Sequence, residues 1–157
     1  MTNQYLYHGS MYNQKELMPG FKRSGVEVKW DKTESNHFLY ATTERSIAEN
    51  LGFASAIEKK FHLKSFHCKG DTLVAESDLN LTMEDLASLE VHIYTIEIKP
   101  DDNWVKNNNE HNRMDSEYKT KNTIENIEKT EPLNIVEWLK NKKVIFTKNV
   151  PAFEGWK

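Results

Sequence analysis

Short apolar and aromatic runs, separated by polar stretches, recur along the whole chain. Residues 4–8 are rich in aromatic side chains and end at a Gly-Ser pair, which predicts a strand that stops at a turn. Residues 38–41 predict a second short strand. Residues 91–98 predict the clearest strand, because β-branched and aromatic residues dominate until a Lys-Pro-Asp-Asp sequence ends it. Further short strands are expected at residues 116–120, 133–138 and 144–147.

Two segments carry the signals of a helix start. Thr42 or Thr43 can cap a helix that has Glu44 in its first turn. Thr82 precedes a second, short helix, in which the acid three residues later completes a sequence like a capping box. The spacing of apolar residues in the first helix predicts a buried face formed by Ile47, Ala48, Leu51 and Ala54.

The remaining segments are mostly irregular. Residues 11–36 predict a long loop with breakers at a Pro-Gly pair and at Gly25, and so long a loop in a small domain is usually functional. Residues 61–63 and 72–75 look extended, within a segment at residues 60–90 that we interpret as an insertion. Many short strands with few helices predict an α+β fold.

The composition fits a single folded domain. A chain of 157 residues can form one compact core but not a second full domain, so residues 1–157 are expected to form one domain. The net charge of -3 gives no global attraction to nucleic acid or to a membrane. The single cysteine, Cys68, cannot form an intrachain disulfide, and no signal sequence or membrane-spanning run is visible. A soluble, cytoplasmic protein without a membrane partner is therefore expected.

The sequence motifs of the common nucleotide-binding folds are missing. There is no G-x-G-x-x-G turn and no P-loop sequence, so dinucleotide binding would use another scaffold. Cleaving the bond between nicotinamide and ribose requires an exposed backbone for the amide, an aromatic face for the ring and a carboxylate beside the developing cation. Gly9, Tyr40 and an acid after the strand at residues 91–98 are candidates for these tasks.

Several segments together resemble one protein family. The Tyr-His-Gly-Ser sequence at residues 7–10 is similar to a His-Gly-Thr strand end, and residues 34–42 contain a sequence similar to an Asn-His-apolar-Tyr strand. In this order the segments resemble the ADP-ribosyltransferases of the His-Tyr type, most closely the bacterial rifamycin (rifampin) ADP-ribosyltransferases. The other similar segments are the Leu-Met-Pro-Gly turn at residues 17–20, the strand at residues 91–97, the acidic pair Asp101-Asp102 and the Glu-Pro-Leu-Asn-Ile-Val sequence at residues 131–136.

The resemblance implies a fold, an activity and a site. The fold would be a split β-sandwich with few helices. The reaction would transfer ADP-ribose from NAD to an acceptor, such as a hydroxyl of a rifamycin-like antibiotic, and release nicotinamide. His8 would anchor the adenosine ribose, Gly9 would hold the nicotinamide amide through its backbone, and Tyr40 would stack on the nicotinamide ring. Asp102 would be the catalytic acid. The NAD-contacting residues implied in this way are His8, Gly9, Ser10, Tyr40 and Ala41.

Three questions stay open at this point. The acid is Asp102, Asp101 or Glu117, because an acidic pair after Pro100 is also a plain turn composition and other branches of the family use a Glu on a later strand. The acceptor is a small molecule, or instead a protein or nucleic acid, because the insertion at residues 60–90 departs from the rifamycin enzymes. The third question is whether the protein is an enzyme, because the alternative is a catalytically silent nucleotide-binding module of the same fold.

Two other chemistries are disfavoured. His62, His67 and Cys68 have the residue types of zinc ligands, but the two histidines would project from opposite faces of a strand and no fourth ligand follows, so no metal site is expected. Transfer of an RNA 2'-phosphate would require several basic residues, and none cluster near His8 in the sequence.

Overall fold

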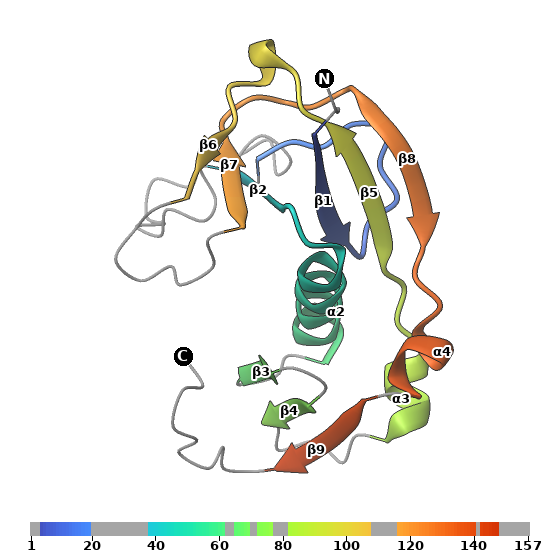
Figure 1. Cartoon of the computed structure of the whole chain (residues 1–157). Coiled ribbons are helices and arrows are strands. Elements are labelled where there is room, and N and C mark those ends of the chain that lie inside the picture. Colours follow the sequence, from blue (N-terminus) through green and yellow to red (C-terminus); the bar gives the residue numbers. More distant parts are fainter. Residues whose placement is uncertain are drawn as a thin grey trace. The chain divides into compact units, whose positions relative to one another are not determined.

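A six-stranded sheet, a three-stranded sheet and three α-helices form the part of the chain that the structure describes (Figure 1). The structure is a computed structural model, and it describes residues 4–19, 38–61, 65–69, 72–76, 82–107, 116–140 and 142–147. The predicted α+β class is confirmed. No helix in these ranges is long and apolar enough to cross a membrane. The chain divides into two units whose segments interleave along the sequence.

The first unit consists of Met1–His8, Asn13–Ala48 and Ile93–Glu131 and contains most of the six-stranded sheet. The strand order is β6-β7-β2-β1-β5-β8, and the β1–β2, β2–β7 and β6–β7 pairs are antiparallel. No strand of this sheet comes from the described residues between 60 and 90, which are 60–61, 65–69, 72–76 and 82–90. Its strands are β1 (Tyr5–Ser10), β2 (Leu39–Thr42), β5 (His92–Glu97), β6 (Val105–Lys106), β7 (Glu117–Thr120) and β8 (Ile127–Pro132).

One face of this sheet carries the core of the first unit. Leu39 and Ala41 are buried in β2, whereas Tyr40 between them is only half-buried, as the period of two in a strand requires. A bridge between Leu17 and Ile124, with N···O distances of 2.9 and 2.7 Å, ties two loop segments to the core. The buried residues of this core are Leu6, Leu17, Leu39, Ala41, Tyr94, Ile96 and Ile124.

The second unit consists of Gly9–Tyr12, Glu49–His92 and Pro132–Lys157. It contains the three-stranded sheet, in which β4 (Thr72–Glu76) pairs antiparallel with β3 (Ser65–Lys69) and parallel with β9 (Lys143–Thr147). Its helical part is most of α2 (Arg45–Phe61), together with α3 (Met83–Ala87) and α4 (Ile135–Leu139).

The core of the second unit forms around α2. The Phe53 ring is fully buried, and its centroid lies 4.8 Å from that of Trp138. Gly52 permits a close approach, because a Cβ atom there would lie 2.8 Å from Val91 Cγ1 and 3.0 Å from Gly9 Cα. The absence of a side chain at Gly52 is therefore what lets α2 pack against the end of β1.

Several predicted elements are confirmed. β5, β7, β4 and β9 form at the predicted positions, within one or two residues. α3 begins as predicted, because the Thr82 side chain caps the Asp85 N–H while the Asp85 carboxylate accepts from the Thr82 N–H, which makes a full capping box.

Two predictions about the segments around β2 are wrong in detail. β1 does not stop before Gly9 and Ser10 but runs through both, so the predicted turn lies later. α2 begins at Arg45, which leaves Glu44 outside its first turn. Thr42 acts instead through a short turn, because its Oγ1 accepts a hydrogen bond of 3.1 Å from the Glu44 N–H.

The buried face of α2 also differs from the prediction. Leu51, a predicted core residue, is 43% exposed, and Ile47 and Ala54 are only half-buried. Gly52 takes the buried position because β1 approaches α2 there too closely for a larger side chain. The buried residues of the helix are Ala48, Gly52, Phe53, Ala56 and Ile57.

The strand predicted at residues 133–138 is wrong, because this segment forms α4. The Asn134 side chain accepts a hydrogen bond of 3.1 Å from the Glu137 N–H and so starts a helix. Ile135 and Leu139, four residues apart, are both buried on one face of it. The predictions for Gly25, His62, residues 20–36 and residues 108–115 lie outside the described residues.

Candidate active site

His8 lies between the main chain of β2 and a buried tyrosine. Its Nδ1 atom is 2.6 Å from the carbonyl oxygen of Tyr40, and its ring centroid is 6.2 Å from that of Tyr94. A carbonyl oxygen can only accept, so Nδ1 must carry the proton. In the neutral ring this leaves Nε2 as a hydrogen-bond acceptor, which suits a hydroxyl donor such as that of a ribose.

Tyr94 supports the His8 ring from the core. Its side chain is fully buried, and its hydroxyl oxygen accepts a hydrogen bond of 2.7 Å from the Gln14 N–H. Burial raises the pKa of the Tyr94 hydroxyl, and the hydrogen bond from Gln14 opposes that shift. The hydroxyl therefore stays neutral at physiological pH and anchors the loop after β1.

The register between β2 and β7 brings together residues that are about 75 positions apart in the sequence. Tyr40 pairs with Lys119, and Thr42 pairs with Glu117. Paired residues on neighbouring strands project from the same face of a sheet, and residues two apart in one strand also share a face. This face therefore presents Tyr40, Thr42, Glu117 and Lys119. Phe38, just before β2, and Lys121, just after β7, lie beside them, because the Phe38 ring contacts Tyr40, Lys119 and Lys121. We name these six residues the β2–β7 ladder.

Glu117 stands at one end of the ladder in a half-buried position. Burial raises the pKa of its carboxyl group, while a hydrogen bond from the Asn107 side chain and the positive charge of Lys119 act in the opposite direction. Asn107 is itself buried and is fixed by a hydrogen bond of 2.9 Å from its N–H to the Glu117 carbonyl oxygen. A carboxyl group in these surroundings is a candidate functional group, because its charge acts where water is partly excluded.

Thr42 and Ser116 hold the start of β7 in place. The Thr42 hydroxyl is buried and donates a hydrogen bond of 3.0 Å to Ser116 Oγ. The Thr43 N–H donates a hydrogen bond of 3.0 Å to the Ser116 carbonyl oxygen. These contacts fix the residue that immediately precedes Glu117 and so orient the carboxyl group relative to β2.

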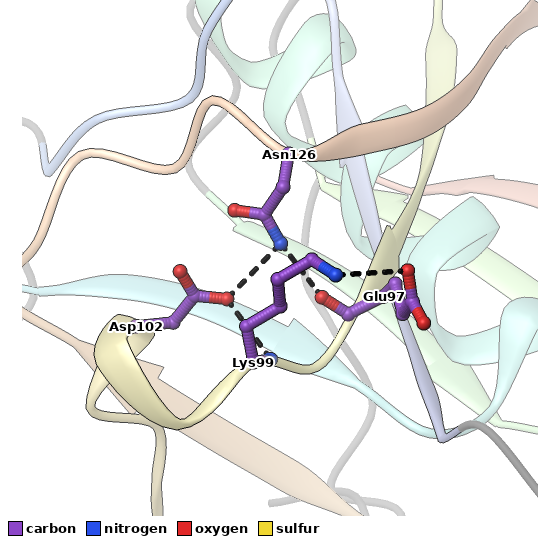
Figure 2. A network of polar contacts seen from close by, with 4 residues as sticks. All are labelled: Glu97, Lys99, Asp102 and Asn126. Carbon is purple, nitrogen blue, oxygen red and sulfur yellow. Dashed lines mark hydrogen bonds and ion pairs between the residues drawn. The ribbon is translucent and has the colours of Figure 1, made fainter.

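Asp102, the acid that the resemblance implies, belongs to a different network (Figure 2). Its Oδ2 atom accepts a hydrogen bond of 3.2 Å from the Lys99 N–H and one of 3.1 Å from Asn126 Nδ2. Asn126 Nδ2 also donates to the Glu97 carbonyl oxygen at 2.7 Å, and Lys99 Nζ forms an ion pair of 3.3 Å with the Glu97 carboxylate. The Asp102 carboxylate thus closes the 3-10 turn Pro100–Asp102.

Asp102 also lies apart from His8 along the sheet. The Ile98 N–H donates a hydrogen bond of 2.9 Å to the Gln4 carbonyl oxygen, so the exit from β5 lies beside the start of β1. His8 follows Gln4 by four residues, which corresponds to about 13 Å along a strand. The structure therefore brings the His8 ring against the main chain of Tyr40, on the face opposite to the Tyr40 side chain, because Tyr7 is the residue of β1 that pairs with Thr42. It brings Glu117 onto the face of the Tyr40 side chain and leaves the Asp102 carboxylate in a turn, which a hydrogen bond of 2.6 Å from Thr120 Oγ1 to the Asp102 carbonyl oxygen ties to the end of β7.

The other NAD-contacting residues that the resemblance implies offer little exposed side chain. Ala41 is 4% exposed, and its side chain packs in the core. Ser10 is also buried, and its Oγ accepts a hydrogen bond of 3.1 Å from the Tyr12 N–H. Gly9 has its Cα against Gly52. Asp101 is exposed, and its carbonyl oxygen accepts a hydrogen bond of 3.0 Å from Asn122 Nδ2.

Sequence reasoning missed Asn107, Lys119, Lys121 and Tyr94, because their importance depends on strand register and packing. Comparisons of the chain with models of known protein families, with characterised proteins and with solved structures find no match. The protein has an α+β fold. Its candidate site consists of a histidine, a tyrosine and a half-buried glutamate on three neighbouring strands of one sheet.

Proposed function

We propose that the protein is a mono-ADP-ribosyltransferase that cleaves NAD with His8, Tyr40 and Glu117. The observation that carries the proposal is the position of Glu117. It projects from the face that carries the Tyr40 side chain, on a strand paired directly with β2, and burial raises the pKa of its carboxyl group. His8 is on the next strand and contacts the Tyr40 backbone.

The proposed fold is the split β-sandwich of the ADP-ribosyltransferases. Its support is an antiparallel sheet in which the strands of His8, Tyr40 and Glu117 are adjacent, in the order β7-β2-β1. The strands at residues 65–76 belong to a separate small sheet, as an insertion into such a fold would.

Each residue has a defined task in the proposed reaction. The Nε2 atom of His8 accepts a hydrogen bond from a ribose hydroxyl of NAD, and the Tyr40 ring packs against the nicotinamide ring. The bond between nicotinamide and ribose breaks, and its electron pair leaves with nicotinamide. The Glu117 carboxylate stabilises the positive charge that develops on the ribose and takes the proton of the acceptor hydroxyl as the new bond to the ribose forms.

Glu117 replaces Asp102 as the proposed acid for a physical reason. The Asp102 carboxylate already accepts from Lys99 and Asn126, and these hydrogen bonds stabilise a turn. The Glu117 carboxyl receives a hydrogen bond from Asn107 and projects from the face that carries the Tyr40 side chain, where a nicotinamide ring stacked on Tyr40 would lie.

Release of nicotinamide from NAD by matched variants tests this assignment. Glu117→Gln keeps the size and the hydrogen-bonding oxygen but removes the charge, and we expect it to lower kcat by about 100-fold or more. Asp102→Asn is the matched control, and we expect it to retain kcat within about threefold. Loss of activity in Asp102→Asn with full activity in Glu117→Gln would reverse the assignment. Binding of NAD to the parent protein without any release of nicotinamide would instead favour the silent binding module.

The acceptor is proposed to be a hydroxyl, with a rifamycin-like antibiotic as the first compound to test. Incubation with NAD and rifampicin, followed by mass spectrometry of the antibiotic, is expected to show the added mass of ADP-ribose. Release of nicotinamide without that mass shift would exclude this acceptor while leaving the cleavage chemistry intact. Labelled NAD incubated with a cell lysate would then show whether protein or nucleic acid receives the label.

A further inference from the structure

The β2–β7 ladder has a basic, aromatic end opposite Glu117. Lys119 Nζ lies 4.3 Å from the centroid of the Phe38 ring, and Lys121 Nζ lies 5.4 Å from the same centroid. The Phe38 ring is in turn 6.2 Å from that of Tyr40. Two ammonium groups and two aromatic rings thus lie together at this end of the ladder.

We propose that this end of the β2–β7 ladder binds single-stranded nucleic acid, with a base stacked on Phe38 and phosphates paired with Lys119 and Lys121. Binding of this kind combines cations that follow the backbone with aromatic rings that accept any base. The half-buried Phe38 ring and the exposed Lys121 side chain supply both parts within a few ångströms of each other. The proposal concerns binding and does not depend on cleavage of NAD.

A base can take the place of the two lysines on the Phe38 ring. Stacking of a base on an aromatic side chain is the contact on which single-stranded nucleic acid binding typically depends, and every base has a face that can make it. The freed ammonium groups then lie beside the stacked nucleotide, where they gain an ion pair with phosphate. Two lysines next to a ring therefore favour a ligand that has both a planar base and a negative charge.

The alternatives fit the ladder less well. Bases in a duplex are already stacked on one another, so their faces are not available to Phe38. An acidic peptide would use the two lysines and leave the ring without a partner. The net charge of -3 provides no long-range attraction, so binding should depend on these local contacts and fall with salt.

If the proposed transferase activity also holds, this site indicates a nucleic-acid acceptor. Glu117 and Lys121 are four residues apart, so a strand bound at the basic end would lie within about 13 Å of the proposed catalytic carboxylate. Lack of binding would overturn the nucleic-acid site and the acceptor class, but not the transferase, because nicotinamide release is measured separately. Lack of nicotinamide release would overturn the transferase and leave the binding site standing.

Fluorescence anisotropy with a labelled thymidine oligonucleotide of about 12 nucleotides, a typical site size, tests the proposal. We expect the double variant Lys119→Gln/Lys121→Gln to bind at least about 10-fold more weakly and to show a salt slope smaller by about 1.4, the value for two phosphate contacts on a single strand. Phe38→Leu is expected to weaken binding by at least about fivefold with an unchanged salt slope.

The matched control is Lys59→Gln/Lys60→Gln, which makes the same change in charge. Lys59 lies 5.1 Å from the Tyr12 ring centroid and Lys60 lies 5.7 Å from that of Phe61, so these are also lysines beside aromatic rings. They sit in the last turn of α2, and their loss is expected to change affinity by no more than about twofold. Circular dichroism of each variant checks that the fold is retained.

Four results would overturn the proposal. They are the absence of binding by the parent protein, equal weakening in the Lys59 and Lys60 control, equal affinity for a duplex of the same length, and displacement of the oligonucleotide by polyglutamate at the same concentration of charge. The last result would show that the lysines recognise charge alone and would point to an acidic protein partner.

Discussion

Glu117 holds its carboxyl group where burial favours the protonated form. Its pKa in the folded protein lies above the ordinary value of 4.5, so the folded state binds this proton more tightly than the unfolded chain does. The stabilising contribution of that proton is fully present below the ordinary pKa and is lost as the pH rises through the raised pKa. Glu117→Gln cannot ionise and keeps an oxygen for Asn107.

We therefore expect the free energy of unfolding of Glu117→Gln, relative to the parent, to rise as the pH increases above the ordinary pKa of 4.5. Urea unfolding of both proteins at a series of pH values measures this difference. A difference that does not change with pH would mean that Glu117 is solvated normally, and it would weaken the case for its role in catalysis.

Asp102 is expected to contribute to stability and not to turnover. Asp102→Ala leaves the Lys99 N–H and one hydrogen bond of Asn126 without an acceptor, which should lower the free energy of unfolding by about 1–3 kcal/mol. Chemical denaturation gives this value, and nicotinamide release by the folded variant should stay close to that of the parent. A stable but inactive Asp102→Ala protein would contradict the structural role.

The residues of the candidate site differ in how well the sequence predicts them. His8 and Tyr40 are in short local motifs, and the structure brings them into contact as neighbours on paired strands. Glu117 is a candidate because the strand register pairs it with Thr42. Register depends on packing across the sheet, and no local sequence motif encodes it. The acidic pair that ends at Asp102 is a plain turn composition, and a turn is what the structure shows.

At the scale of secondary structure, α2 depends on a glycine. Gly52→Ala should gain up to about 1 kcal/mol in helix propensity, but its Cβ would lie within 3.0 Å of the Gly9 backbone, which cannot move without disturbing β1. We expect overpacking to dominate and the variant to lose about 1–3 kcal/mol of stability. Ser55→Ala, at an exposed position of the same helix, is the control and should be neutral or slightly stabilising. If both variants gain stability, then β1 and α2 are not closely packed at Gly9.

The elements that were predicted correctly have strong local signals. β5 is a dense run of β-branched and aromatic residues, and α3 starts with a complete capping box at Thr82. The segment at residues 133–138 was mispredicted because a short apolar run fits either a strand or a helix, and the choice depended on one side chain, that of Asn134. The face of α2 was mispredicted because the close approach of Gly9 selects the buried residues, and that contact is distant in the sequence.

At the scale of the whole molecule, elements are shared between the two units. The boundary between the units falls within β1, α2, β5 and β8, so each of these elements contributes residues to both. If one unit unfolds, each shared strand or helix loses part of its length, and the part that remains in the other unit is destabilised. This sharing favours a single cooperative unfolding transition, as is usual for chains of this size.

Core variants of the two units test this cooperativity. Leu6 is fully buried in the first unit, and Phe53 is fully buried in the second unit. We expect Leu6→Ala to lower the free energy of unfolding by about 2–5 kcal/mol and Phe53→Ala by about 3–5 kcal/mol, each within one transition. Val136→Ala, at a position that is 56% exposed, is the control and should change stability by less than about 0.5 kcal/mol. Trp104 packs on the core of the first unit and Trp138 packs on Phe53, so tryptophan fluorescence reports on both cores and should follow the same transition as far-UV circular dichroism in every variant. Separate midpoints from the two signals in Leu6→Ala or Phe53→Ala would show that the units do not unfold in one transition, despite the elements that they share.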